Sequence, residues 1–228
     1  MSEMPLLSDL DLASLLCSRV CHDIISPVGA ITNGLEVLDD EDDEAMKEIA
    51  LDLIRRSAKT ASAKLQFCRM AFGASGSAGA YLDLTEAEQV ARGFIGDEKV
   101  KLLWDTPKET RPKSEVKLLL NLLLIAVSGI PRGGEVTIRM ADDQFSATAT
   151  GEGAKLPEKP ASLLQGEVAE ADIDPRLVQV YYAARVAREL GYAIDLKLEN
   201  SALTVVAHRA GGEASQADPE HEDTAREV

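Results

Sequence analysis

The sequence predicts an α+β fold, in which an antiparallel hairpin of two long helices precedes a domain of the α/β sandwich type. Apolar residues recur at three- and four-residue steps in two long segments of the first third of the chain, and this spacing is typical of amphipathic helices. The remainder alternates short strand-like segments with helical ones, which indicates helices covering one face of a mostly antiparallel sheet.

The first long helix carries one apolar stripe and, away from it, a histidine. The stripe consists of Leu6, Leu10, Ala13, Cys17, Val20, Ile24, Val28, Ile31, Leu35 and Leu38. His22 lies about 200° from Val20 and from Ile24 on a helical wheel, so we expect its side chain to face solvent. Pro27 lacks a backbone donor, and its position predicts either a kink in one continuous helix or a break between two shorter helices.

Small side chains surround His22 on its side of the helix, where a solvated helix normally has Glu and Lys. The residues that share this side at three- and four-residue steps are Ser18, Ile25, Ser26, Gly29 and Asn33. Small residues let the backbone of another protein approach closely, and Ile25 adds an apolar contact outside the core. We therefore expect this side of the helix to be a docking surface.

The second long helix follows the acidic turn 39–43, whose negative charge favours a helix start. Its stripe consists of Met46, Ile49, Leu53, Ala61, Leu65 and Phe72. Two antiparallel helices bury only one face against each other, so we expect a homodimer in which two hairpins form a four-helix bundle. The side of the first helix that carries His22 then stays open to a partner.

Mirroring the hairpin about Asp40 and Glu41 places Lys59 of the second helix close to the level of His22.

Composition and capping signals divide the chain into four parts. We expect the helical hairpin at 1–73, a Gly-, Ala- and Ser-rich linker at 74–81, the α/β domain at 82–210 and a disordered acidic tail at 211–228. In the domain, the expected helices start at the capping residues Thr85, Ser114 and Asp174 and end near Ile95, Val127 and Leu190. The expected strands are Val100–Trp104, Glu135–Met140, Phe145–Thr150, Ala193–Leu198 and Leu203–His208.

Overall composition excludes several classes of function. With 228 residues and a formal net charge of −15, the chain lacks the basic surface that nucleic-acid binding requires. It has no long apolar run and no signal peptide, so we expect a cytoplasmic protein without a membrane segment. Its three cysteines lack metal-ligand spacing, so no metal site is expected.

The stretch His22-Asp23-x-x-x-Pro27 resembles the H-box of two-component histidine kinases, in which the histidine is followed by an acid and later by a proline. The resemblance implies that His22 is catalytic and carries a phosphoryl group on an imidazole nitrogen, a role that suits a neutral imidazole because it is a good nucleophile. Asp23 is expected either to hold the imidazole tautomer or act as a local base, or to be an ordinary solvated helix acid.

The second domain resembles the ATP-binding domain of histidine kinases, the GHKL or Bergerat fold, and Asn121-Leu-Leu-Leu-Ile125-Ala126 is similar to its N-box. Three nucleotide contacts of that family are missing. Ile125 occupies the position of the family's Mg²⁺ ligand, and Ala149 occupies that of the aspartate that binds adenine. Tyr181 lies in the stretch that is glycine-rich in the family, where the backbone approaches phosphates. We therefore expect this chain to bind neither ATP nor any other cofactor.

An H-box hairpin joined to an ATP-incompetent kinase-like domain resembles the ChpT-type histidine phosphotransferases of alphaproteobacteria. This resemblance implies phosphotransfer from the receiver aspartate of a hybrid histidine kinase (CckA-like) to His22, and onward to response regulators (CtrA-like and CpdR-like). Mg²⁺ is then expected in the partner receiver. Several cations are expected to offset phosphate or to meet the acidic receiver, with Lys59 and Arg56 ranked first; they are Arg19, Arg55, Arg56, Lys59 and Lys64. They lie beside Ile25, Ser26, Gly29 and Asn33 of the docking surface.

Two other functions stay open from the sequence. One is an active ATP-dependent histidine kinase, which would require a different alignment of the nucleotide motifs. The other is a non-enzymatic scaffold that docks on kinases, for which His22 would be dispensable.

Overall fold

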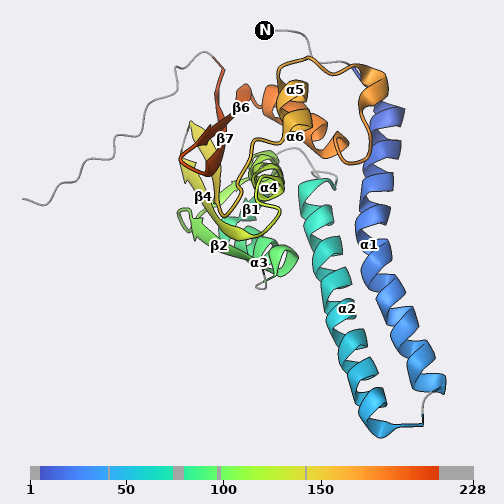
Figure 1. Cartoon of the computed structure of the whole chain (residues 1–228). Coiled ribbons are helices and arrows are strands. Elements are labelled where there is room, and N and C mark those ends of the chain that lie inside the picture. The colour runs from blue at the N-terminus through green and yellow to red at the C-terminus, as the bar shows by residue number, and fades with distance from the viewer. Residues whose placement is uncertain (1–5, 41, 74–79, 97–98, 142, 211–228) are drawn as a thin grey trace, which may run out of the picture.

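The computed structural model describes residues 6–40, 42–73, 80–96, 99–141 and 143–210. A long helical hairpin projects from an α/β domain, as the sequence predicts (Figure 1). Residues 74–79 of the expected linker and the expected acidic tail 211–228 lie outside the described residues. In the described part of the chain, no helix is both long and apolar enough to cross a membrane.

The hairpin consists of α1 (Asp9–Asp40) and α2 (Glu44–Ala71). The Asp43 side chain caps α2 by accepting a hydrogen bond from the amide of Ala45 at 2.9 Å. Pro27 is buried inside α1, which is continuous, so the alternative of two shorter helices is wrong. The proline is tolerated because α2 packs against this turn and supplies a replacement donor, described below.

Gly34 lets the two helices approach closely. A Cβ atom at this position would lie 2.7 Å from Ile54 Cγ1 and 3.3 Å from the Ala50 carbonyl oxygen. Much of the predicted apolar stripe stays exposed in the single chain, because α2 covers the neighbouring side of α1. The large apolar side chains exposed on the hairpin are Leu10, Ile25, Val28, Leu35, Val37, Met46, Ile49, Leu51, Leu53 and Leu65.

The main sheet of the domain has the strand order β2-β4-β5-β7-β6. Its strands are β2 (Val100–Asp105), β4 (Gly134–Ala141), β5 (Gln144–Thr150), β6 (Tyr192–Glu199) and β7 (Ala202–Arg209). The β2–β4 pair is parallel and the other pairs are antiparallel, which confirms the mostly antiparallel sheet. A second sheet pairs β1 (Tyr81–Asp83) with β3 (Thr110–Pro112). Strands of three residues show no periodicity, so these two were not among the predicted strands.

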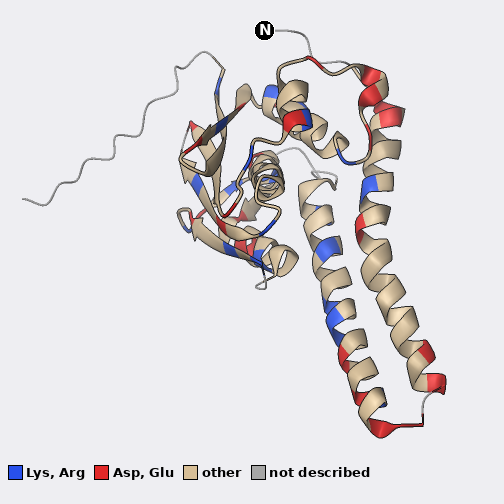
Figure 2. Cartoon of the chain, viewed as in Figure 1, with Lys and Arg blue, Asp and Glu red and all other residues tan. Residues whose placement is uncertain are grey.

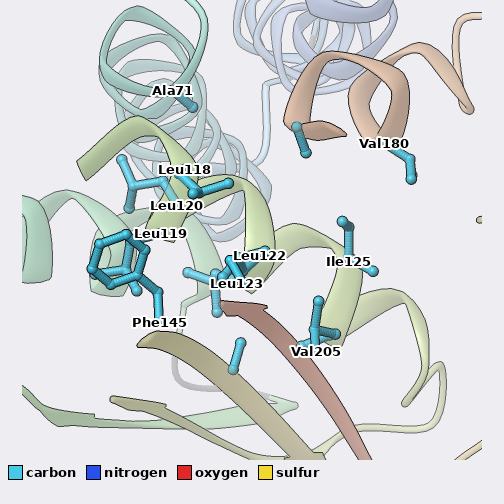
Figure 3. Packing of buried hydrophobic residues seen from close by; sticks show 14 of the residues in the cluster. Ala71, Leu118, Leu119, Leu120, Leu122, Leu123, Ile125, Phe145, Val180 and Val205 are labelled. Atoms are coloured by element: carbon cyan, nitrogen blue, oxygen red, sulfur yellow. The ribbon is translucent and has the colours of Figure 1, made fainter. Parts of the chain in front are cut away.

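Helices cover one face of the main sheet. They are α3 (Leu84–Ile95), α4 (Lys113–Ser128), α5 (Glu158–Leu164) and α6 (Val178–Glu189), with a short 3₁₀ turn, η1 (Glu170–Asp172). Helix α4 is buried along most of its length and lies between the strands and the end of α2 (Figure 3). Its leucines 118, 119, 120, 122 and 123 are fully buried beside Phe145 and Val205 of the sheet.

Three predicted helix starts are corrected. Asp83, rather than Thr85, caps α3 by accepting from the amide of Thr85 at 2.8 Å. Ser114 lies inside α4, which begins directly after the β1–β3 pairing. Asp174 accepts from the amide of Leu177 at 2.8 Å, but it closes a separate turn, and α6 begins only at Val178.

Both ends of the hairpin are fixed to the domain. The Phe67 and Phe94 rings stack with centroids 4.1 Å apart and join α2 to α3. Asn121 of α4 is fully buried and donates to the carbonyl of Ala71, the last residue of α2, at 3.2 Å. Just before α1, the amide of Leu7 donates to the Tyr181 hydroxyl of α6 at 3.0 Å. These contacts fix the direction in which the hairpin projects.

Two glycines of α1 make a matched pair for testing the packing. We expect Gly34→Ala to lower the free energy of unfolding by about 1–3 kcal/mol, because its Cβ collides with Ile54. Gly29→Ala should raise it by up to about 1 kcal/mol, since a Cβ there meets nothing within 4 Å and alanine favours the helix. Urea denaturation measures both; a Gly34→Ala protein as stable as the wild type would contradict the close approach.

Candidate functional site

His22 lies near the middle of α1 with 68% of its side chain exposed, as its position off the apolar stripe predicts. Its Nδ1 lies 3.3 Å from Oδ1 of Asp23, the next residue along the helix. In the tautomer that carries the proton on Nδ1, this contact is a hydrogen bond to the carboxylate, and Nε2 presents its lone pair to solvent. The arrangement suits nucleophilic attack by Nε2.

Asp23 is held from two sides. Its side chain is only 17% exposed, and Arg19, one turn earlier, donates from Nε to Oδ2 at 2.9 Å. Its backbone carbonyl accepts a hydrogen bond from Nζ of Lys64 on α2, also at 2.9 Å. These contacts distinguish Asp23 from an ordinary solvated helix acid, and its role toward His22 remains a prediction.

The register of the hairpin differs from the predicted one. The contact between Asp23 and Lys64 places Lys64 at the level of the histidine, so the expectation that Lys59 lies there is wrong. The predicted register assumed that the hairpin turn is centred on Asp40 and Glu41. In the structure α1 ends at Asp40 and α2 starts only at Glu44, so the centre of the turn lies further along the chain. Lys59 and Arg56 are both exposed on α2, where Arg56 pairs with the carboxylate of Asp52 at 2.5 Å.

The predicted docking surface is open in the single chain. Ile25 is 71% exposed, and the side chains of Ser18, Ser26 and Asn33 are exposed with it. A Cβ atom at Gly29 would meet nothing within 4 Å. Basic residues follow α2 beside this region, while acidic ones gather at the turn of the hairpin (Figure 2).

A buried thiol underlies the site and has no distinctive signal in the sequence beyond its place one turn after Lys64. Cys68 is 7% exposed, whereas Cys17 and Cys21 are exposed. Burial raises the pKa of the Cys68 thiol to about 11, and the nearby Asp23 carboxylate adds to the rise, although Arg19 and Lys64 oppose it. The thiol therefore stays protonated and neutral beneath the charged groups.

The three residues expected to replace nucleotide contacts are all buried. Ile125 and Ala149 belong to the apolar core. Tyr181 is fully buried, and its hydroxyl accepts a hydrogen bond from the amide of Leu7. Asn121 donates to the carbonyls of Ala71 and Lys117 and accepts from Gln179 Nε2 at 3.1 Å. Within the described ranges, no group of three His, Cys, Asp or Glu side chains is placed to hold a metal ion.

The family model for the histidine phosphotransferase C-terminal domain matches residues 84–202, which include most of the α/β domain. The chain belongs to the histidine phosphotransferase family. It is 46% identical to the protein phosphotransferase ChpT of Brucella abortus over 194 residues, or 83% of this chain and 91% of the relative. A solved structure of a bacterial phosphotransferase matches with a TM-score of 0.82 and 41% identity, covering 90% of this chain and 100% of that one.

These comparisons confirm the ChpT-type resemblance and the α+β fold, and they support a phosphotransferase role. The Brucella relative is covered over nearly its whole length, so the similarity includes the helical hairpin as well as the matched domain. The hairpin of this histidine phosphotransferase carries the exposed His22, and the α/β domain is the base to which the hairpin is fixed.

We expect the stability of this phosphotransferase to fall between pH 9 and pH 11 in part because of Cys68. In the unfolded chain the thiol ionises near its ordinary pKa of 9.0, whereas the folded protein keeps it protonated until about 11. Rising pH thus favours the unfolded state over this range. Unfolding free energies of wild type and Cys68→Ala, measured across these pH values, should differ in slope, with the steeper fall in wild type; equal slopes would contradict the burial of a protonated thiol.

Proposed function

We propose that this phosphotransferase is the histidine intermediate of a phosphorelay. His22 accepts a phosphoryl group from the receiver aspartate of a hybrid histidine kinase (CckA-like) and passes it to receiver domains of response regulators (CtrA-like and CpdR-like), in the cytoplasm. The observation that carries the proposal is the exposed His22, adjacent to a partly buried Asp23, on the long helix of a histidine phosphotransferase.

The proposed chemistry is a reversible displacement at phosphorus. The lone pair of Nε2 attacks the phosphorus of the receiver's aspartyl phosphate, so that an N–P bond forms while the P–O bond to the aspartate breaks and the carboxylate leaves with the electron pair. The proton on Nδ1 stays on the ring, where Asp23 Oδ1 at 3.3 Å stabilises the positive charge that the ring acquires. The same steps in reverse transfer the group to the aspartate of the next receiver.

The docking surface beside His22 suits the approach of a receiver. Ile25 offers an exposed apolar contact, and Gly29 leaves room for a closely packed backbone. The receiver supplies its own Mg²⁺ through its acidic residues. Exposed cations of α2, Arg56 and Lys59, would then meet the acidic receiver at the rim of the contact, where charge complementarity mainly accelerates association.

We further propose that the phosphoryl group comes from a receiver and not from ATP. Buried Ile125 offers no oxygen ligand for Mg²⁺, which requires oxygen donors. Buried Ala149 has no carboxylate for an adenine amino group, and the hydroxyl of Tyr181 already accepts a hydrogen bond from the amide of Leu7. The polar groups that nucleotide binding needs are thus replaced by packing.

The exposed apolar residues of the hairpin support a homodimer. Leu10, Val28 and Leu35 belong to one stripe of α1, and Met46, Ile49 and Leu53 lie on α2 near the turn. Exposed apolar side chains in this number indicate an interaction site, and a second hairpin would cover them as a four-helix bundle. His22 lies off this stripe, so two active histidines would face outward from the dimer.

We expect His22→Gln to abolish phosphoryl transfer in both directions while the fold and the dimer persist. The side chain is exposed, and exposed substitutions change stability by under about 0.5 kcal/mol. Incubation with a receiver labelled on its aspartate measures transfer, and circular dichroism with light scattering measures fold and mass. A His22→Gln protein that still becomes labelled would assign the carrier role to another residue.

We expect Gly29→Arg to block exchange with receivers while leaving the hairpin folded. The reacting atoms must approach to about 3–3.5 Å, and a long side chain on the docking surface prevents this closure. Gly93→Arg, the same change at an exposed glycine of α3, serves as the control and should exchange normally. Normal transfer by Gly29→Arg would remove this side of α1 from the receiver contact.

Radiolabelled ATP separates a receiver-fed phosphotransferase from an ATP-dependent kinase. The purified protein should stay unlabelled with ATP and Mg²⁺ alone and become labelled when a kinase with its receiver is added. Labelling of His22 by ATP alone would contradict the proposal that the donor is a receiver.

A further inference from the structure

The helix that carries His22 has a gap in its hydrogen-bond ladder. In an α-helix the amide of each residue donates to the carbonyl four residues earlier, and proline has no amide proton. The carbonyl left without a backbone donor by Pro27 is that of Asp23, the residue next to the histidine. Yet α1 continues from Asp9 to Asp40 through this point.

A side chain of the opposite helix fills the gap. Nζ of Lys64 donates to the Asp23 carbonyl oxygen at 2.9 Å, and the lysine is half-buried between the helices. An ammonium donor makes a stronger hydrogen bond than an amide, because the donor is charged. The lysine therefore satisfies the carbonyl that Pro27 leaves without a backbone donor in the interior of the helix.

The contact fixes the residue that faces the reacting imidazole. Asp23 is anchored through its carbonyl by Lys64 and through its carboxylate by Arg19 at 2.9 Å, and its remaining carboxylate oxygen faces His22 Nδ1 at 3.3 Å. Without Lys64, this turn would have an unsatisfied carbonyl on one side and only the Arg19 ion pair on the other. The direction of the His22 ring depends on this turn.

We propose that Lys64 is a positioning residue for phosphotransfer, which replaces the backbone donor missing at Pro27 and so fixes the turn that orients Asp23 and His22. This inference rests on the proposed role of His22 as the phosphoryl carrier. Lys64 acts through Asp23 and needs no contact with the receiver. In-line transfer is sensitive to small displacements of the nucleophile, so a loosened turn slows the reaction without removing any reacting group.

A double-mutant cycle with Pro27→Ala tests the assignment. Lys64→Met keeps the aliphatic stem but removes the donor, and it should slow transfer from a labelled receiver about tenfold, the effect of about 1.4 kcal/mol in the barrier. In the Pro27→Ala background the amide of residue 27 can donate to the Asp23 carbonyl. Lys64→Met should therefore slow transfer by less than about twofold in that background. Lys64→Arg, which keeps a charged donor, should retain most of the rate.

The controls separate this role from a general effect of charge or folding. Lys47→Met removes a lysine near the hairpin turn, where Nζ pairs with Glu44 at 3.1 Å, and it should leave the rate unchanged. In ¹⁵N-resolved NMR spectra, Lys64→Met should shift the balance of the two His22 ring tautomers, and Pro27→Ala should restore it. A Lys64→Met protein with the wild-type rate, or an equal tenfold loss in both backgrounds, would overturn the inference. Absence of label on wild-type His22 would instead contradict the proposed function.

Discussion

The joint between the hairpin and the α/β domain is the constraint on which the rest of this structure depends. The hairpin is a pair of helices whose exposed apolar residues outnumber the buried ones on α1, and a pair of this kind has little stability of its own. It is held by the end of α2 against α3 and α4, and by the segment before α1 against α6. Position and direction of His22 follow from this joint, because α1 is continuous from its fixed end to the histidine.

The joint includes Tyr181 and Asn121, two residues whose surroundings in the sequence resemble nucleotide motifs. The Tyr181 hydroxyl accepts a hydrogen bond from the amide of Leu7. Asn121 donates from its side-chain amide to the carbonyl of Ala71 in α2. Both residues use their polar groups for contacts inside the molecule, and a buried polar group is stabilising only when all its partners are present.

The sequence predicted the broad fold and the exposed histidine because both depend on periodicity. The apolar spacing of α1 predicts a half-exposed helix, and the run of leucines in α4 predicts a largely buried one. The exact helix starts and the register of the hairpin were harder to predict from the sequence. Thr85 and Asp83 are both good capping residues, and only the pairing of β1 with β3 decides in favour of Asp83. Lys64 was indistinguishable from Lys59, because the register of an antiparallel hairpin depends on the length of its turn and on the close approach at Gly34.

Attachment of the hairpin at two places has a thermodynamic consequence for any partner. A domain hinged at one linker samples many orientations, and a ligand that fits only one of them binds with an affinity reduced by the fraction of molecules in that orientation. Rotation of this hairpin would require separating the Phe67–Phe94 stack and the buried Asn121–Ala71 hydrogen bond together. Nearly all molecules would therefore present the histidine helix in one orientation, and the receivers of the proposed phosphorelay would meet the same surface without the entropic cost of selecting it.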